Sequence, residues 1–182
     1  MRCPRGPGER TLVLRPMEPS ESSSIALRLL AVLGLVLLNA FFVAAEFALV
    51  GARRTRLEEM AQRGDKKAVL AQRAQKSLDR YISATQLGIT LTSLGLGWIG
   101  EPIFSSLLAP VLDGLRIQSP DVRHTISFLV GFTVITFLHI TAGEQAPKWF
   151  AIQKPLPTSL WVATPLHWFA WIPVWIWGLA GI

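Results

Sequence analysis

The chain has 182 residues, of which 51% are hydrophobic and only 16% are charged. Soluble domains carry about 25% charged residues, whereas the stretches 25–50, 81–99 and 156–182 are almost free of charge here. Stretches of about 20 apolar residues are typical of membrane spans, so the composition argues against a soluble globular domain. The single cysteine, Cys3, excludes an intramolecular disulfide.

The net charge of +6 is unevenly distributed. Half of the 18 Lys and Arg residues fall in the segment 53–80, between two apolar stretches. A basic loop between two spans marks the cytoplasmic side under the positive-inside rule. The charge therefore predicts a cytoplasmic loop and no nucleic-acid binding.

The N-terminal part of the chain predicts a tail followed by a first span. Residues 1–24 contain four Pro, four Arg and four Ser, which favours a disordered tail. The start is open between Met1 and Met17, and a start at Met17 would suit an outside N-terminus better, because it removes those arginines. The stretch 25–50 predicts the first span, long enough for a tilted crossing.

The basic segment 52–80 predicts two short amphipathic helices on the cytoplasmic surface, interrupted at Gly64-Asp65 and attracted to anionic lipid. The stretch 81–99 predicts an unusually polar second span. Gly100-Glu101-Pro102 is expected to end that helix, followed by an outer loop over 100–124 with a short helix inside it.

A third span is predicted over 125–150, and it is expected to be distorted. Gly143, Glu144 and Pro147 occur together near its end. Such a break in a membrane helix is tolerated where it lines a cavity or contacts protein.

The Trp-rich stretch 156–182 has two competing interpretations. Its hydropathy favours a fourth span, but Pro157, Pro165 and Pro173 argue against a straight one, and tryptophan prefers the membrane interface. The apolar end at Ile182 indicates a truncated domain. The expected fold is an all-α membrane protein in which this stretch is an interfacial helix or a fourth transmembrane helix.

Polar residues in the predicted spans are the candidate site. Glu46, Glu144 and Gln86 each lie four to seven residues from a basic flank, about 6 to 10 Å at 1.5 Å per residue. If those flanks mark one membrane face, the three side chains converge at one depth. An ionisable residue inside a span is costly, so it is functional or partnered by default.

These groups are oxygen donors, which suit Mg²⁺, Na⁺ or Ca²⁺. Thr90 and Ser93 share a helix face with Gln86, and a broken helix would free carbonyls around Gly143. The alternative for Glu46, Gln86 and the hydroxyls is interhelical hydrogen bonding, and for His139 a structural polar role. No nucleophile, phosphate-loop, His-Glu-x-x-His or Cys-x-x-Cys motif is present, so the chain is not expected to be an enzyme.

Five short motifs follow one another along the chain. They are Asn39-Ala-Phe-Phe-Val-Ala-Ala-Glu-Phe-Ala-Leu49, Val50-Gly-Ala-Arg-Arg-Thr-Arg-Leu57, Ala84-Thr-Gln-Leu-Gly-Ile-Thr-Leu91, Gly97-Trp-Ile-Gly-Glu-Pro102 and Gly143-Glu-Gln-Ala-Pro-Lys148. Over residues 25–182 the chain thus resembles the transmembrane domain of the cyclin-M/CorC (CNNM-type, hemolysin-C-like) family of magnesium and cobalt transporters.

The resemblance implies a multi-pass domain of the cell membrane, here a bacterial inner membrane. It implies three transmembrane helices, an outside N-terminus, a homodimer and a cytoplasmic-side belt-like juxtamembrane helix formed by 156–182. It also implies Mg²⁺ export with Na⁺ as the coupling ion. The cytosolic CBS domains that usually follow and sense ATP-Mg²⁺ are missing from this chain.

The resemblance implies that Glu144, Gly143 and Glu46 face the ion. Magnesium-transporting members commonly have a serine where this chain has Ala45, and asparagines in span two where it has Ile89 and Ser93. Either Gln86, Thr90 or Ser93 takes the place of these missing ligands, or the chain transports a different ion, or it does not transport at all. Two hypotheses follow: a cation transporter domain, and a non-transporting membrane anchor or regulatory protein.

Overall fold

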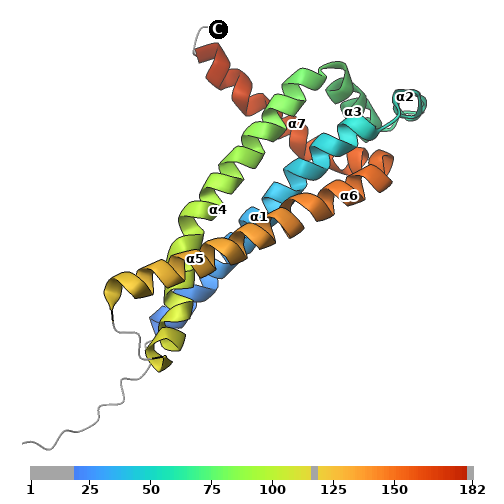
Figure 1. Cartoon of the computed structure of the whole chain (residues 1–182). Helices are drawn as coiled ribbons and strands as arrows, with labels where there is room; N and C mark the ends of the chain where they lie inside the picture. The colour runs from blue at the N-terminus through green and yellow to red at the C-terminus, as the bar shows by residue number, and fades with distance from the viewer. Residues whose placement is uncertain (1–18, 116–118, 180–182) are drawn as a thin grey trace, which may run out of the picture.

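The computed structural model describes residues 19–115 and 119–179, which are helical almost throughout and contain no strand. The elements are α1 (Pro19–Gly51), α2 (Arg54–Gln62), α3 (Lys66–Lys76), α4 (Leu78–Gly114), α5 (Pro120–Leu138), the π-helix η1 (His139–Gln145), α6 (Ala146–Gln153) and α7 (Pro155–Leu179). The predicted all-α fold is confirmed for these residues (Figure 1).

The predicted tail over 1–24 is wrong for its last residues, because α1 begins at Pro19. Proline is favoured at the first position of a helix. Residues 1–18 lie outside the described residues.

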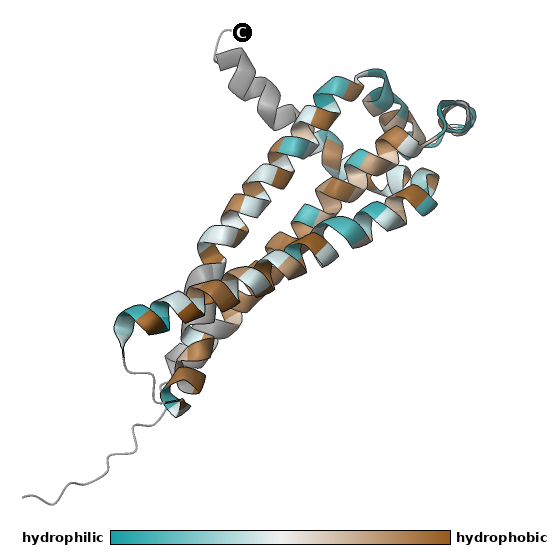
Figure 2. Cartoon of the chain, viewed as in Figure 1, coloured by the Kyte–Doolittle hydropathy of each residue, from teal (hydrophilic) through white to brown (hydrophobic). Residues whose placement is uncertain are grey.

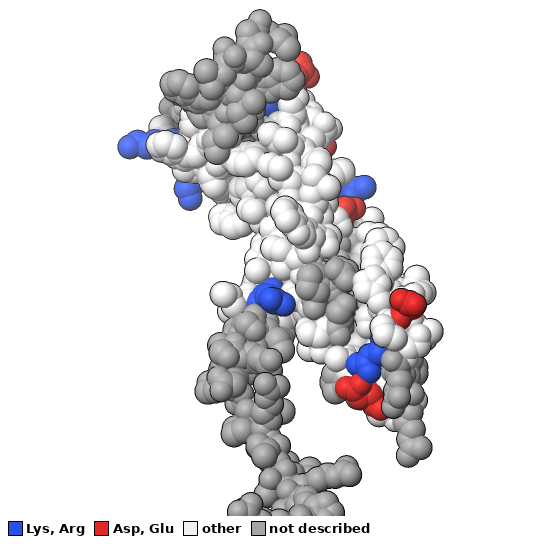
Figure 3. Space-filling view, turned by 90° about the vertical axis from the view of Figure 1, so that its left-hand side faces the viewer, with Lys and Arg blue, Asp and Glu red and all other residues white. Residues whose placement is uncertain are grey.

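Within residues 19–115 and 119–179, two stretches are long and apolar enough to cross a membrane, Ala26–Gly51 and Pro120–Gln153. In the first stretch, only 22% of the most apolar part is buried within the chain, and in the second only 17%. A core helix of a soluble protein would bury this surface, so the outward-facing apolar area is that of a membrane protein (Figure 2). Most of the described surface in Figure 3 is uncharged. Helix α4 is more polar, and its crossing stays a prediction.

Helices α1 and α4 lie side by side in opposite directions, and η1 and α6 run alongside α1 in the same direction (Figure 1). Asn39 is hydrogen-bonded to Thr92, and Glu46, further along α1, to Thr85, which is earlier in α4. This alternation of direction is what successive membrane crossings would produce.

The prediction that Gly100-Glu101-Pro102 ends the second long helix is wrong, because α4 continues to Gly114. Proline lacks an N–H and disfavours a helix interior, but packing against α5 holds the extension. Gly100 approaches Ile135 so closely that a β-carbon would collide with its side chain. Ile103 and Leu112, beyond the proline, are both buried.

The predicted outer loop over 100–124 is correspondingly short. The connection from α4 to α5 lies between Gly114 and Pro120, and α5 begins at Pro120, a residue that suits the first turn of a helix. Arg123 donates a hydrogen bond to the Asp113 carboxylate across this connection. The ion pair fastens the two helix ends to each other.

The basic segment forms two helices, as predicted. Gly64 has φ +88°, a backbone conformation that L side chains rarely adopt, and Asp65 caps α3 by accepting hydrogen bonds from the backbone N–H groups of Lys67 and Ala68. The apolar faces of α2 and α3 pack on protein rather than pointing outward. Their buried cluster comprises Ala52, Leu57, Ala68, Ala71 and Ala163.

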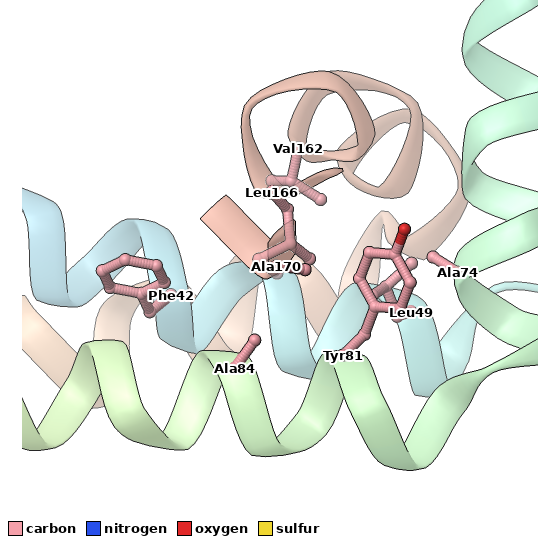
Figure 4. Packing of buried hydrophobic residues seen from close by; sticks show 9 residues of the cluster. Phe42, Leu49, Ala74, Tyr81, Ala84, Val162, Leu166 and Ala170 are labelled. Carbon is pink, nitrogen blue, oxygen red and sulfur yellow. The ribbon is translucent and has the colours of Figure 1, made fainter. Parts of the chain in front are cut away.

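Helix α7 packs across α1, α3 and α4 through a second buried cluster (Figure 4). The cluster contains Phe42, Ala45, Leu49, Ala74, Tyr81, Ala84, Val162, Leu166 and Ala170. Arg80 donates to the Ala170 carbonyl at 3.2 Å, and the Tyr81 hydroxyl lies 2.8 Å from His167 Nδ1. These contacts join the middle of α7 to the first turn of α4.

Gln75 of α3 closes the end of α1. Its Nε2 donates to the carbonyls of Leu49 at 2.9 Å and Ala52 at 2.7 Å, and the residue is buried. The last carbonyls of a helix have no partner within the helix. We expect Gln75→Leu to lower the free energy of unfolding by about 1 kcal/mol, because both carbonyls lose a donor.

Unfolding of the detergent-purified chain by a chemical denaturant would measure this loss. Gln72→Leu, on the same helix but only half-buried, is the matched control. Equal effects of the two variants would show that Gln75 is not a structural cap of α1.

Candidate functional site

A buried asparagine joins three elements at the centre of the bundle. Asn39 of α1 is 0% exposed. Its Nδ2 donates to the Gly143 carbonyl of η1 at 3.1 Å, and its Oδ1 accepts from the Thr92 hydroxyl of α4 at 2.8 Å. A polar side chain in an apolar span must be partnered in this way, because leaving it unpaired costs free energy.

The π-helix η1 confirms the predicted distortion and has a local cause. Pro147 has no N–H to donate to the carbonyl four residues earlier, which is that of Gly143. Asn39 supplies a donor to this carbonyl instead. A β-carbon at Gly143 would lie 3.2 Å from both Asn39 Nδ2 and His139 Cδ2, so the close approach favours glycine. Such π-helical turns occur frequently at functional sites.

A second group of polar side chains lies next to this contact. Ser93 Oγ is 3.2 Å from His139 Nε2, and His139 Nδ1 is 3.8 Å from Glu144 Oε1. The Glu144 side chain is 39% exposed. Ser93, Thr136 and His139 also line a cavity of ≈ 180 Å³ between α4 and α5. Glu144 therefore has a partly exposed carboxylate with His139 as its neighbour.

Glu46 belongs to a separate polar contact. Its Oε2 accepts from the Thr85 hydroxyl at 3.4 Å, and Thr85 is fully buried. Glu46 lies seven residues beyond Asn39 on α1, which is about 10 Å along the helix. The candidate site thus has two polar layers, Glu46 with Thr85 and Asn39 with Thr92.

The prediction that Glu46, Glu144 and Gln86 converge at one depth is therefore wrong for Glu144, whereas Gln86, next to Thr85, is level with Glu46. The prediction assumed that the basic flanks of the three spans lie at the same depth in the membrane. Lys148, the basic flank of Glu144, instead lies beside Phe47, with its Nζ 4.8 Å from the centre of the ring. Phe47 comes six residues before Arg53, the basic flank of Glu46, so the two flanks are at different depths. The docking of Gly143 on Asn39 sets this register.

Gln86 and Thr90 are exposed on the outer face of α4, and the Thr90 hydroxyl donates to the Gln86 carbonyl of the same helix at 2.8 Å. Of the candidate ligands, Gly143 and Glu144 lie on η1 and Ser93 is linked to Glu144 through His139, whereas Glu46, Gln86 and Thr90 lie elsewhere. Within residues 19–115 and 119–179, no three His, Cys, Asp or Glu residues form a group that could hold a metal.

The site candidates chosen from sequence omitted Asn39, Thr85, Thr92 and His139. One signal for Asn39 was available, because an amide inside an apolar stretch two turns from Glu46 shares its helix face. The spacing of Thr85, Gly88 and Thr92 is likewise typical of a close helix contact.

Comparison with known proteins matches residues 29–180 to the model of the cyclin M transmembrane N-terminal domain. The chain is 46% identical over 145 residues to the UPF0053 protein YugS of Bacillus subtilis, covering 80% of this chain and 34% of that protein. It is 52% identical over 136 residues to the UPF0053 protein YhdT of the same organism, covering 74% of this chain and 29% of YhdT. It is 39% identical over 147 residues to the UPF0053 protein sll0260 of Synechocystis, covering 80% of this chain and 32% of sll0260.

The chain thus spans about a third of the length of these relatives. The family model covers most of the chain, including every residue of both polar layers and the whole of η1. The chain therefore belongs to the cyclin M transmembrane N-terminal domain family.

Proposed function

We propose that this chain is the membrane domain of a cation transporter, in which the ion binds where α1, α4 and η1 meet. The observation that carries the proposal is η1 itself. It brings the Gly143 carbonyl to Asn39, and the Glu144 carboxylate to 3.8 Å from His139, which in turn lies 3.2 Å from Ser93, in an otherwise apolar part of the chain. Discontinuous membrane helices are the usual place for ion sites in transporters.

Mg²⁺ is the proposed ion, exported and coupled to Na⁺. Carboxylate, carbonyl and hydroxyl oxygens are ligands suited to Mg²⁺, which usually keeps several waters and so needs few protein ligands. Glu144 would supply the negative charge, and the Ser93 hydroxyl and the Gly143 carbonyl would be neutral oxygen ligands of the ion. Export, the coupling ion, the homodimer and the outside N-terminus rest on the family resemblance alone.

The finer architecture belongs to the same proposal. Helices α1, α4 and α5–α6 would be three spans, and α7 the cytoplasmic-side belt. The burial of Val162, Leu166 and Ala170 against α1, α3 and α4 supports a helix laid across the bundle. The basic residues of α2 and α3 would then lie on the cytoplasmic side.

A non-transporting anchor or regulatory protein is the second candidate. Ala45 is 0% exposed in the buried cluster that α7 completes, and Ile89 packs against the same cluster. These are two of the positions at which magnesium-transporting members of the resembled family carry polar residues. Here both positions contribute to apolar packing instead.

A Mg²⁺ titration of thermal stability tests the transporter proposal. An ion that binds only the folded state stabilises it by mass action, about 2.7 kcal/mol at one hundred times the dissociation constant. We expect a saturable rise in Tm in Mg²⁺ that Glu144→Gln abolishes. The control Glu58→Gln makes the same change of charge at an exposed position of α2 and is expected to keep the rise.

A rise that Glu144→Gln leaves intact would contradict the proposed ligand role. Parallel titrations with Na⁺ and Ca²⁺ identify a different ion, and ion flux measured with a full-length protein in proteoliposomes decides between transport and the second candidate. Absence of flux together with absence of any ion-dependent stabilisation would favour the anchor.

A further inference from the structure

We infer that a groove between α1, α6 and α7 binds one anionic phospholipid, with its phosphate at Lys154 and an acyl chain along the groove. The groove has a volume of ≈ 570 Å³. It is lined by Ala44, Phe150, Lys154, Pro157, Thr158 and Trp161. This site is separate from the proposed ion site and does not depend on transport.

The walls of the groove suit an acyl chain. Phe150 and Trp161 are largely exposed and present aromatic surface to it, while Ala44 and Pro157 are apolar. Thr158 is buried, and its hydroxyl donates to the Lys154 carbonyl at 2.7 Å, so its proton is already used. The Thr158 hydroxyl therefore adds no free hydrogen-bond donor to the groove.

The charge at one end of the groove suits a phosphate. Lys154 lies between α6 and α7 and is exposed. In the described ranges of the chain, no carboxylate pairs with its ammonium. An unpaired cation at the edge of an apolar groove is complementary to the phosphate of an anionic lipid, and basic residues next to membrane spans attract such lipids.

The direction of the groove matches the direction of a membrane lipid. Pro155, which follows Lys154, lies against Gly51 at the end of α1, where a β-carbon on Gly51 would be 3.2 Å from Pro155 Cβ. Ala44 is seven residues nearer the middle of α1, about 10 Å along the helix. The charged end of the groove thus lies at the end of α1 that the basic segment follows, and its apolar part extends toward the apolar middle of α1.

Trp161 forms the wall on the α7 side. Its ring lies edge-on to Phe41, with the ring centres 5.9 Å apart, which holds the indole in place while most of the residue stays exposed. Phe41 lies ten residues before Gly51, so the indole lines the part of the groove nearer the apolar middle of α1. The groove therefore has a cation at one end and aromatic and apolar walls along the rest, which suits the phosphate and the acyl chain of a phospholipid.

Native mass spectrometry of the detergent-purified chain tests this site. Dioleoylphosphatidylglycerol is the anionic probe and dioleoylphosphatidylcholine the neutral one. We expect the anionic lipid to bind more tightly, and Lys154→Gln to weaken it about fivefold while leaving the neutral lipid unchanged, since one basic residue near anionic lipid contributes about 1 kcal/mol. Lys67→Gln, at an exposed lysine of α3, is the charge-matched control.

Trp161→Ala tests the apolar part of the site, with Trp168→Ala as its control. Both tryptophans are exposed on α7, but only Trp161 lines the groove. We expect Trp161→Ala to weaken both lipids and Trp168→Ala to weaken neither. Lys154→Arg keeps the charge and is expected to bind the anionic lipid as the parent chain does, which tests the charge even where Lys154→Gln fails to fold.

The inference is overturned if the two lipids bind equally well, or if Lys67→Gln weakens the anionic lipid as much as Lys154→Gln does. Equal effects of the two tryptophan variants would also overturn it, because the acyl chain would then not lie in this groove. Loss of Mg²⁺-dependent stabilisation with lipid binding intact would reject the proposed function and leave the lipid site standing.

Discussion

Gly88→Ala is expected to lower the free energy of unfolding by about 1–3 kcal/mol, the usual cost of overpacking. Gly88 lies where α4 meets α1, and a β-carbon there would come within 2.6 Å of three atoms of the Phe42 ring. Phe42 is buried and also packs against Phe169, with ring centres 4.6 Å apart. The ring therefore cannot move aside without disturbing the cluster that joins α1, α4 and α7.

The control for this prediction is Gly97→Ala, further along the same helix. A β-carbon at Gly97 would meet nothing within 4 Å, so we expect no loss of stability. Thermal and denaturant unfolding in detergent measures both variants. Similar stability of the two would mean that α1 and α4 do not meet as closely at Gly88 as the structure has them.

Asn39→Leu is expected to lower the free energy of unfolding by a similar amount, about 1–3 kcal/mol, because it leaves the Gly143 carbonyl without this donor. Leucine keeps the approximate size of the side chain but cannot donate to Gly143 or accept from Thr92. The carbonyl cannot turn to Pro147 for a replacement, since proline has no N–H. The stability of η1 therefore depends on a side chain from another helix.

A double-mutant cycle with Thr92→Val separates this network from simple loss of packing. Residues in one hydrogen-bond network give non-additive changes in stability, so the double variant is expected to lose less than the sum of the single losses. Leu38→Ala, at an exposed neighbour of Asn39, is expected to change stability little and serves as control. Additive losses in the cycle would refute the network.

The positions of the apolar stretches, the two basic helices and the distortion near Gly143 were all predictable from sequence. Each depends on the local sequence. The apolar stretches follow from hydropathy over about 20 residues, and the break between the basic helices from Gly64, which adopts a positive φ. The distortion follows from a glycine, a glutamate and a proline within five residues of one another. Local chemistry of this kind decides where helices form and where their hydrogen bonds fail. Of the candidate site, the same reasoning identified the Gly143–Glu144 segment and its oxygen donors.

Tertiary structure alone decided the continuity of α4 and the arrangement of the polar side chains. Pro102 should end a helix on its own, but burial of Ile103 and Leu112 holds the extension in place. The depth of Glu144 relative to Glu46 depends on the register between two helices, set by the contact of Gly143 with Asn39. That register is a property of packing between segments 104 residues apart, so no count of residues from a basic flank can supply it.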